Sequence, residues 1–170
     1  PPCPGDAHPT ALKIVSEEEA ESKLTGEGGD SASTASGIGV ETVRALSATR
    51  AGLCHAARDR EKSRTALDGI FDASRMELVQ MDQASLESVR TAAKQILDKT
   101  DKVNILVENA GIMAVPSLEF TKDGHELQFG TNHLSHFLLF ELLKPALLKA
   151  VTPDLNSRVV VLASSGHHAG

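Results

Sequence analysis

Four continuous apolar runs, separated by segments with helical spacing, constrain the fold of this 170-residue chain most strongly. The runs are AGLCHAA (51–57), MELVQM (76–81), VNILV (103–107) and SRVVVLASS (157–165). Helical patterns lie before and between them, at 40–49, 58–67, 86–99 and 124–150. Apolar strands that alternate with helices are typical of a parallel α/β sheet covered on both faces. We therefore expect an α/β fold with a doubly wound parallel sheet flanked by helices.

Two of the helices have local signals of their own. Ser85 is placed to cap the helix at 86–99, and one apolar face of that helix is predicted from the spacing of its side chains. This face comprises Leu86, Val89, Ala93, Ile96 and Leu97. The segment 124–150 is apolar enough to pack on the sheet, and we expect a bend before Pro145.

The charge of the chain is unevenly distributed. Residues 1–33 hold seven acidic residues against Lys13 and Lys23, whereas the rest of the chain is close to neutral. Residues 1–26 are therefore predicted to be an acidic, mobile tail, and residues 27–170 the folded domain. A chain of net charge −6 has no basic excess for nucleic acid.

Apolar segments and cysteines exclude further classes. No apolar run approaches the ~18 residues of a membrane span, and no signal segment opens the chain, so we expect a cytoplasmic protein. Cys3 and Cys54 form no motif, and neither a disulfide framework nor a metal site is predicted.

Small and polar residues gather where the predicted strands end. These positions are Ser36 to Gly39, Arg58, Asp82, Asn109 to Gly111, and Ser164 with Ser165. In a doubly wound sheet, ligands bind at the carboxyl ends of the strands. Five such positions favour a ligand site more strongly than any one of them alone.

The sequence SGIG, residues 36–39, has the form of a glycine turn that opens a helix. Such a turn lets backbone N–H groups approach a pyrophosphate, although it is also common at ordinary helix starts. Arg58 follows Gly39 at the spacing where a second strand ends, and a basic side chain there suits the 2′-phosphate of NADP. The alternative for Arg58 is a solvated residue at a helix start. Asp82 could accept a hydrogen bond from adenine or simply lead into a helix.

Several motifs together resemble the short-chain dehydrogenase/reductase family, in its retinol-dehydrogenase and WW-domain-oxidoreductase branch. They are SGIG, AARD, MDQASLESVR, ILVENAGIM, DGHELQFGTNHLSHFLL and RVVVLASSGHH, and the resemblance covers about residues 24–170. It implies a Rossmann fold that binds NADP and a reaction on a small-molecule carbonyl/alcohol pair. The implied cofactor-binding residues are Ser36, Gly37, Ile38, Gly39, Arg58, Asp82, Asn109, Ala110 and Gly111. The implied catalytic residues are Asn132, which holds a proton-relay water, and Ser165, which polarises the substrate.

The chain departs from the family pattern in ways that affect both fold and activity. The family's acid/base is a Tyr with a Lys four residues later, and this chain contains no Tyr and ends at Gly170. We therefore expect a partial Rossmann domain whose last strands are absent and which is inactive, or nearly so, by itself. Gly28 to Ser31 stand at the first strand and predict a degraded one, for which ALKIV (11–15) is an alternative.

Three single positions also depart from the pattern. Arg50 stands where a helix-ending Gly is expected, and His55 lies inside a strand. Glu108 replaces the first Asn of the family's N-N-A-G, and its carboxylate is expected to repel a phosphate-bearing cofactor. His133 and His136 are interpreted as packing residues of the long helix.

Other readings of the chain remain open. It could be a non-catalytic truncated paralogue that binds cofactor or a partner, with its last strand as an exposed edge for self-association. It could equally be a fragment or an imperfect gene model of a working enzyme. A hydrolase using His167 and His168 lacks an oxyanion turn, and a methyltransferase would need an acid in place of Arg58.

Overall fold

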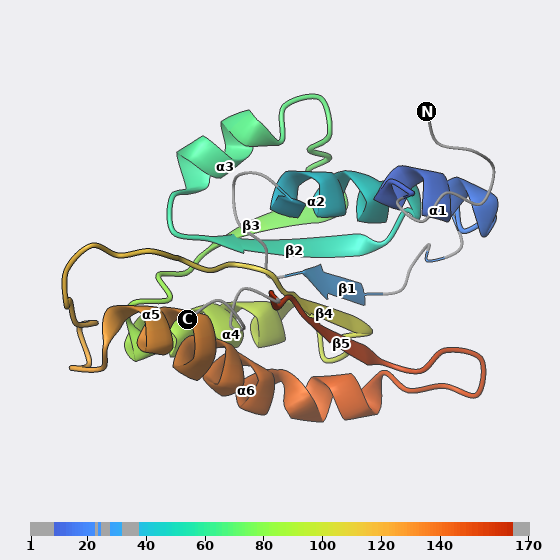
Figure 1. Ribbon diagram of the computed structural model, residues 1–170. Helices are drawn as coiled ribbons and strands as arrows, with labels where there is room; N and C mark the ends of the chain where they lie inside the picture. The colour runs from blue at the N-terminus through green and yellow to red at the C-terminus, as the bar shows by residue number, and fades with distance from the viewer. Residues whose placement is uncertain (1–8, 23, 25–27, 32–37, 165–170) are drawn as a thin grey trace.

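The computed structural model describes residues 9–22, 24, 28–31 and 38–164 (Figure 1). The helices are α1 (Ala11–Glu17), α2 (Ile38–Ala48), α3 (Arg60–Ala66), α4 (Leu86–Lys99), α5 (Leu127–Phe129), the π-helical turn η1 (Gly130–Leu134) and α6 (Ser135–Lys149). The strands are β1 (Gly28–Ser31), β2 (Gly52–Ala57), β3 (Met76–Gln80), β4 (Ile105–Glu108) and β5 (Arg158–Val161). Each predicted apolar run coincides with one strand, and β4 extends one residue past its run, to Glu108.

The strands are all parallel, and hydrogen bonds join them into two sheets. One sheet has the order β1-β2-β3 and the other consists of β4 and β5. β1 contacts β4 and lies between it and β2 (Figure 1), which gives the order β3, β2, β1, β4, β5 across the molecule. From β1 the chain adds β2 and β3 on one side, and it then crosses to the other side to add β4 and β5. The boundary between β1 and β4 is therefore the topological switch point, at which doubly wound folds bind ligands.

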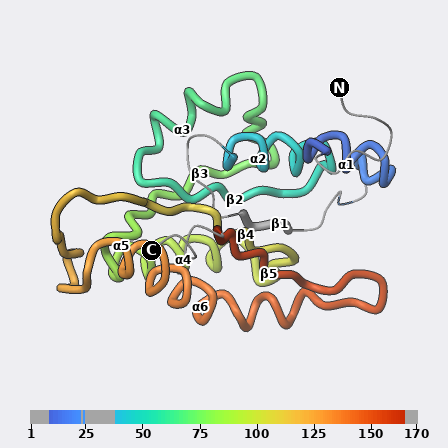
Figure 2. Tube along the Cα trace, viewed as in Figure 1, coloured from blue at the N-terminus to red at the C-terminus, as the bar shows by residue number. Residues whose placement is uncertain are grey.

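The first strand forms at Gly28–Ser31, as the family pattern implied. Its register with β2 runs from Gly28 opposite Gly52 to Ser31 opposite His55. The alternative that ALKIV replaces this strand is wrong, because residues 11–15 belong to α1. Thr10 caps α1 by accepting a hydrogen bond from the backbone N–H of Lys13 at 3.2 Å. The helix then contacts α2 (Figure 2).

Two hydrophobic clusters cover the two faces of the β2–β3 sheet. Adjacent residues of β3 point to opposite faces, so Leu78 joins the cluster with α2 and Val79 joins the cluster with α4 and α6. Figure 1 shows α2 and α3 on one side of the strands and α4 and α6 on the other. The predicted doubly wound arrangement of parallel strands between helices is confirmed.

The predicted Ser85 cap of α4 is confirmed, but the buried face of this helix differs from the predicted apolar face. The Ser85 hydroxyl accepts from the Ser88 backbone N–H at 3.3 Å. The buried residues are Val89, Ala92, Ala93 and Ile96, whereas Leu97 is 39% exposed. Its inclusion in the apolar face was wrong, because each residue turns a helix by about 100° and Ile96 already occupies the position facing the core.

The long segment before Lys149 is a helix with an irregular start. α5 leads into the single π-helical turn η1, and α6 then continues through Pro145. Gly130, the first residue of η1, is buried against Thr121, and a Cβ at Gly130 would lie only 2.5 Å from Thr121 Cγ2. α6 has 15 residues, and no helix among the described residues is long and apolar enough to cross a membrane.

Candidate functional site

A pocket of about 610 Å³ opens at the carboxyl ends of β2, β3 and β4. Its walls come from segments far apart in the sequence, namely 56–59, 81–84 and 110–116, with Glu119 and single residues from α3, α5 and η1. Parallel strands end at the same edge of a sheet, and this brings the three segments together. The volume is in the range of a site for a small molecule or cofactor.

The pocket contains four of the predicted site residues. Arg58, Asp82, Ala110 and Gly111 all line it. Asn132 follows the lining residue Thr131, and Asn109 precedes Ala110. Ile38, 69% exposed, and Gly39, which is buried, begin α2 and are not among the lining residues described. Ser36, Gly37 and Ser165 lie outside the described residues.

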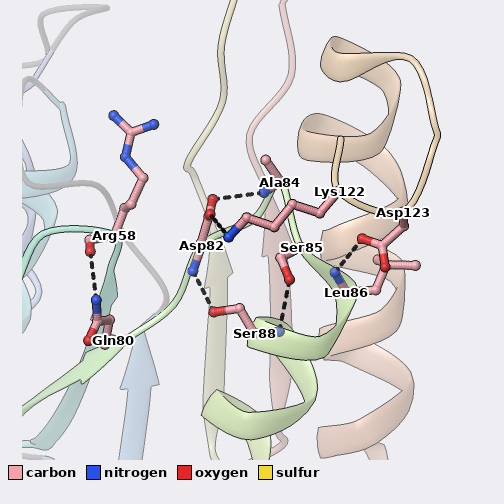
Figure 3. A network of polar contacts seen from close by, with 9 residues as sticks. All are labelled: Arg58, Gln80, Asp82, Ala84, Ser85, Leu86, Ser88, Lys122 and Asp123. Atoms are coloured by element: carbon pink, nitrogen blue, oxygen red, sulfur yellow. Dashed lines mark hydrogen bonds and ion pairs between the residues drawn. The ribbon is translucent and has the colours of Figure 1, made fainter. Parts of the chain in front are cut away.

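Arg58 leaves the end of β2 with its side chain exposed. The backbone carbonyl accepts from Gln80 Nε2 at 3.4 Å, while the guanidinium extends away from Gln80 (Figure 3). Asp59 is the N-cap of α3, because its Oδ1 accepts from the Lys62 N–H at 3.0 Å. Lys62 also lines the pocket. Two cationic side chains therefore line the pocket, and the Asp59 carboxylate, which also lines it, caps α3.

Asp82 is held by contacts on both sides of its carboxylate (Figure 3). Oδ1 accepts from the Ala84 N–H at 3.1 Å, and Oδ2 lies 3.2 Å from Lys122 Nζ. Its backbone N–H donates to Ser88 Oγ at 2.9 Å. A carboxylate fixed in this way presents its remaining lone pairs in a defined direction.

Lys122 is a residue of the site that the sequence reasoning missed. The Lys122 N–H donates to the Ala84 carbonyl at 3.0 Å, and the Leu86 N–H donates to Asp123 Oδ2 at 2.8 Å. The turn at 122–123 is thereby fastened to the start of α4 (Figure 3). No sequence signal links Lys122 to Asp82, because the two lie far apart along the chain and meet only when it is folded.

Asn132 holds the segment that follows β4. Its Oδ1 accepts from the Ile112 N–H at 2.8 Å and its Nδ2 donates to the Ile112 carbonyl at 2.7 Å. A Cβ at Gly111 would lie 3.2 Å from Asn132 Oδ1. The small residues of the Asn109–Gly111 turn thus allow the backbone to approach η1 closely, beside the pocket.

Glu108 does not face the pocket as a free carboxylate. It is 4% exposed, and its Oε2 lies 3.7 Å from Nδ1 of His136, which is itself 8% exposed. His136 Nε2 lies 2.8 Å from the Ala110 carbonyl. The structure therefore does not support the expected repulsion between Glu108 and a cofactor, because the carboxylate is buried and faces the His136 imidazole.

The other two departures from the family pattern are also placed. Arg50, two residues after the end of α2, lies in the left-handed region with φ of 61°, the conformation that favours the missing Gly. His55 is 2% exposed in β2, and burial lowers its pKa to about 4. Its ring is consequently neutral at pH 7. His133 lies exposed between the rings of Phe129 and Phe137, with centroids at 5.1 and 6.5 Å.

Comparisons with known proteins identify relatives of this chain. Residues 32–168 match the family described as short chain dehydrogenase. The short-chain dehydrogenase/reductase prx1 of Penicillium roqueforti is 46% identical over 165 residues, which are 97% of this chain and 48% of that protein. Human retinol dehydrogenase 13 is 41% identical over 137 residues, 79% of this chain and 40% of that protein. The chain spans about half the length of the curated relatives it matches.

Solved structures agree with this assignment. An uncharacterized Mycobacterium paratuberculosis protein superposes with a TM-score of 0.70 at 35% identity, over 85% of this chain and 48% of that one. A 3-ketoacyl-(acyl-carrier-protein) reductase from Brucella melitensis superposes with a TM-score of 0.67 at 23% identity, over 84% of this chain and 59% of that one. The second likeness concerns the fold alone. The strand order and the pocket at the strand ends, together with these matches, place the chain in the short-chain dehydrogenase/reductase family.

Proposed function

We propose that residues 27–170 form the NAD(P)-binding domain of an NADP-dependent oxidoreductase that acts on a carbonyl/alcohol pair. The observation that carries the proposal is the pocket at the ends of β2, β3 and β4, with Arg58 exposed on one wall. The names of the relatives, a dehydrogenase/reductase and a retinol dehydrogenase, support the class of reaction.

The residues of the pocket fit such a cofactor. Gly111 and Ala110 leave room for a ribose, because a larger side chain would fill the rim next to Asn132. Asp82 offers fixed carboxylate oxygens to an adenine amino group, in competition with Lys122. Ile38 and Gly39 begin α2, where helix N–H groups favour a phosphate. When bound, the cofactor would donate a hydride to the carbon of a carbonyl substrate or accept one from the carbon of an alcohol.

Selectivity for the 2′-phosphate is assigned to Arg58, with Lys62 as the second cation. Among the described residues, neither side chain has an ion-pair partner. Guanidinium groups bind phosphate with two parallel hydrogen bonds, and such charge-assisted bonds are worth about 1.5–3 kcal/mol. This corresponds to a preference of roughly 10- to 100-fold for NADPH over NADH.

The test is calorimetric titration of the 170-residue chain with NADPH and with NADH. Arg58→Glu should raise the NADPH Kd by roughly 10- to 100-fold and change the NADH Kd by less than about 3-fold. Arg60→Glu is the matched control, because Arg60 is exposed, lies two residues later and is not among the pocket-lining residues described. Equal losses for the two cofactors would refute the assignment of Arg58. A folded chain that binds neither would refute the proposed function.

Turnover requires groups beyond this pocket. Ser165 is proposed to orient the substrate and Asn132 to support the proton relay, by resemblance to the family. The 170 residues contain no Tyr to transfer the proton. Loss of a positioned acid/base costs about 10²- to 10⁴-fold in rate, so we expect cofactor binding with little or no NADPH oxidation by this chain alone. Measurable oxidation with a small aldehyde would contradict this expectation.

The second candidate is association through the edge of β5. All four residues of this strand are exposed, and Val161 is 61% exposed. Within the described chain, β5 pairs only with β4. An apolar strand edge is a template for a further strand. Sedimentation of the chain should then reveal dimers that Val161→Lys weakens, and a monomer at every concentration would exclude this candidate.

A further inference from the structure

Beneath the rim of the pocket, two ionisable side chains are buried against each other. Glu108 at the end of β4 is 4% exposed, and His136 in the first turn of α6 is 8% exposed. Glu108 Oε2 lies 3.7 Å from His136 Nδ1, and Glu108 Oε1 has no hydrogen-bond partner among the described residues. A buried carboxyl group is costly without a close partner, and among the described residues its one ion-pair contact is with His136.

The other ring nitrogen of His136 faces the backbone of the rim. Nε2 lies 2.8 Å from the Ala110 carbonyl oxygen and 2.6 Å from Gln83 Nε2. A carbonyl can only accept, so the contact with Ala110 requires a proton on Nε2. The Gln83 amide can flip and offer its oxygen instead, whereas the backbone carbonyl has no such freedom. The geometry therefore favours the tautomer in which Nε2–H donates to Ala110.

With Nε2 directed at the Ala110 carbonyl, Nδ1 lies on the opposite side of the ring and faces Glu108. The 3.7 Å between Glu108 Oε2 and His136 Nδ1 is longer than a hydrogen bond, so the two side chains act on each other through packing and electrostatics. Glu108 thereby limits the orientations open to the imidazole, because both side chains are buried.

The consequence reaches the pocket through Ala110, which lines it. Asn132 and His136 are one helical turn apart, and each holds one backbone position of the rim: Asn132 holds Ile112 and His136 holds Ala110. We propose that Glu108 and His136 act as one unit of positioning residues, in which Glu108 orients the imidazole and the imidazole fixes the Ala110–Ile112 segment for the cofactor. Only the last step, toward the cofactor, rests on the proposed function.

The first test follows the rim without any cofactor, by hydrogen exchange of the Ile112 amide. The reference is the Leu53 amide of β2, which lies in the other sheet and donates to the Arg75 carbonyl. Glu108→Gln and His136→Asn should each speed the exchange of the Ile112 amide by about 10-fold relative to this reference. The double variant should be no faster than His136→Asn alone, because the two side chains act as one unit. His133→Asn, at the exposed histidine one turn away, is the matched control and should change nothing.

Two measurements test the pair directly, the nitrogen NMR signals of the His136 imidazole and the exchange of the Ile112 amide. In the unmodified protein, the imidazole nitrogen signals of His136 should report a proton on Nε2, and a proton on Nδ1 alone would overturn the proposal. Additive effects in the double variant, or Ile112 exchange that changes only in step with Leu53, would also overturn it. NADPH titration is the third measurement: Glu108→Gln should raise the Kd by about 3- to 10-fold. If the unmodified chain fails to bind NADPH, the proposed function fails while the exchange results still decide the role of the pair.

Discussion

The side-chain amide of Asn132 satisfies both backbone groups of Ile112, the N–H at 2.8 Å and the carbonyl at 2.7 Å. This pair of hydrogen bonds joins η1 to the segment after β4, and Ile112 itself lines the pocket. The residue that the family resemblance marks as catalytic is thus also a structural clamp in this chain. The clamp can be tested by a substitution that keeps the shape of the side chain.

Asn132→Asp keeps the acceptor for the Ile112 N–H but places a carboxylate oxygen against the Ile112 carbonyl. We expect the free energy of unfolding at pH 7 to fall by about 1–2 kcal/mol, the cost of one lost and one repulsive contact. Urea denaturation measures the change. Asn156→Asp, in an exposed loop, makes the same chemical change without the clamp and should cost less than about 0.5 kcal/mol. Equal losses in the two variants would rule out the clamp.

Gly130→Ala tests the close approach between η1 and Thr121. A Cβ would lie 2.5 Å from Thr121 Cγ2, so one of the two must move, and we expect a loss of about 1–3 kcal/mol in unfolding free energy. Thr121→Ser removes the Cγ2 atom and keeps the hydroxyl that accepts from the His125 N–H. The double variant should recover at least half of the loss. If the double variant lost as much unfolding free energy as Gly130→Ala alone, the cause would lie in the π-helical backbone and not in the contact with Thr121.

His55 predicts a dependence of stability on pH. Its pKa is about 4 in the folded chain and 6.5 when unfolded, so between these values the unfolded state binds a proton that the folded state does not. Unfolding free energy therefore falls as the pH decreases from 6.5 to 4, by up to about 3 kcal/mol from this residue. His55→Leu should remove this part of the fall in denaturation curves measured between pH 7.5 and 4.5. His133→Leu, at an exposed histidine, should leave it in place.

Arg50→Gly should stabilise the protein. Arg50 has φ of 61°, and a left-handed conformation costs a residue with a Cβ about 1–2 kcal/mol. Part of this gain is offset because Gly is freer in the unfolded chain, which leaves roughly 0.5–1 kcal/mol. Calorimetry should show Tm rising by about 1–4 °C. Arg90→Gly, the same substitution inside α4, should lower Tm instead. A fall in both variants would contradict the explanation from φ.

Local sequence patterns were enough to predict β2 to β5, α4 and two of the lining residues at strand ends, but not α1, which lies in the segment expected to be a tail. The apolar runs marked β2 to β5, the Ser85 cap marked α4, and the spacing of Arg58 and Asp82 placed both at the pocket. These features depend on residues within a few positions of each other, or on the rule that parallel strands end at one edge.

Contacts between distant segments could not be predicted in this way. The π-helical turn arises where Gly130 meets Thr121, and the ion pair of Asp82 with Lys122 joins two segments that are remote in the sequence. The prediction for Glu108 rests on its place in the family's N-N-A-G motif, whereas the residue it contacts, His136, lies on another element. Each of these features is determined by packing, and one sequence carries no direct record of which side chains meet.

The boundary between β1 and β4 has a consequence for the order of folding. In the first sheet β2 pairs Leu53 with Met76 of β3, whereas in the second β4 pairs Ile105 with Arg158 of β5, which closes a longer loop of chain. Doubling a loop adds about 0.6 kcal/mol of closure entropy, and rates fall as contacts become less local. In pulse-labelled refolding, we expect the Leu53 amide to become protected before that of Leu162, which donates to Glu108. During synthesis, the strands of the first sheet all leave the ribosome long before β5 exists.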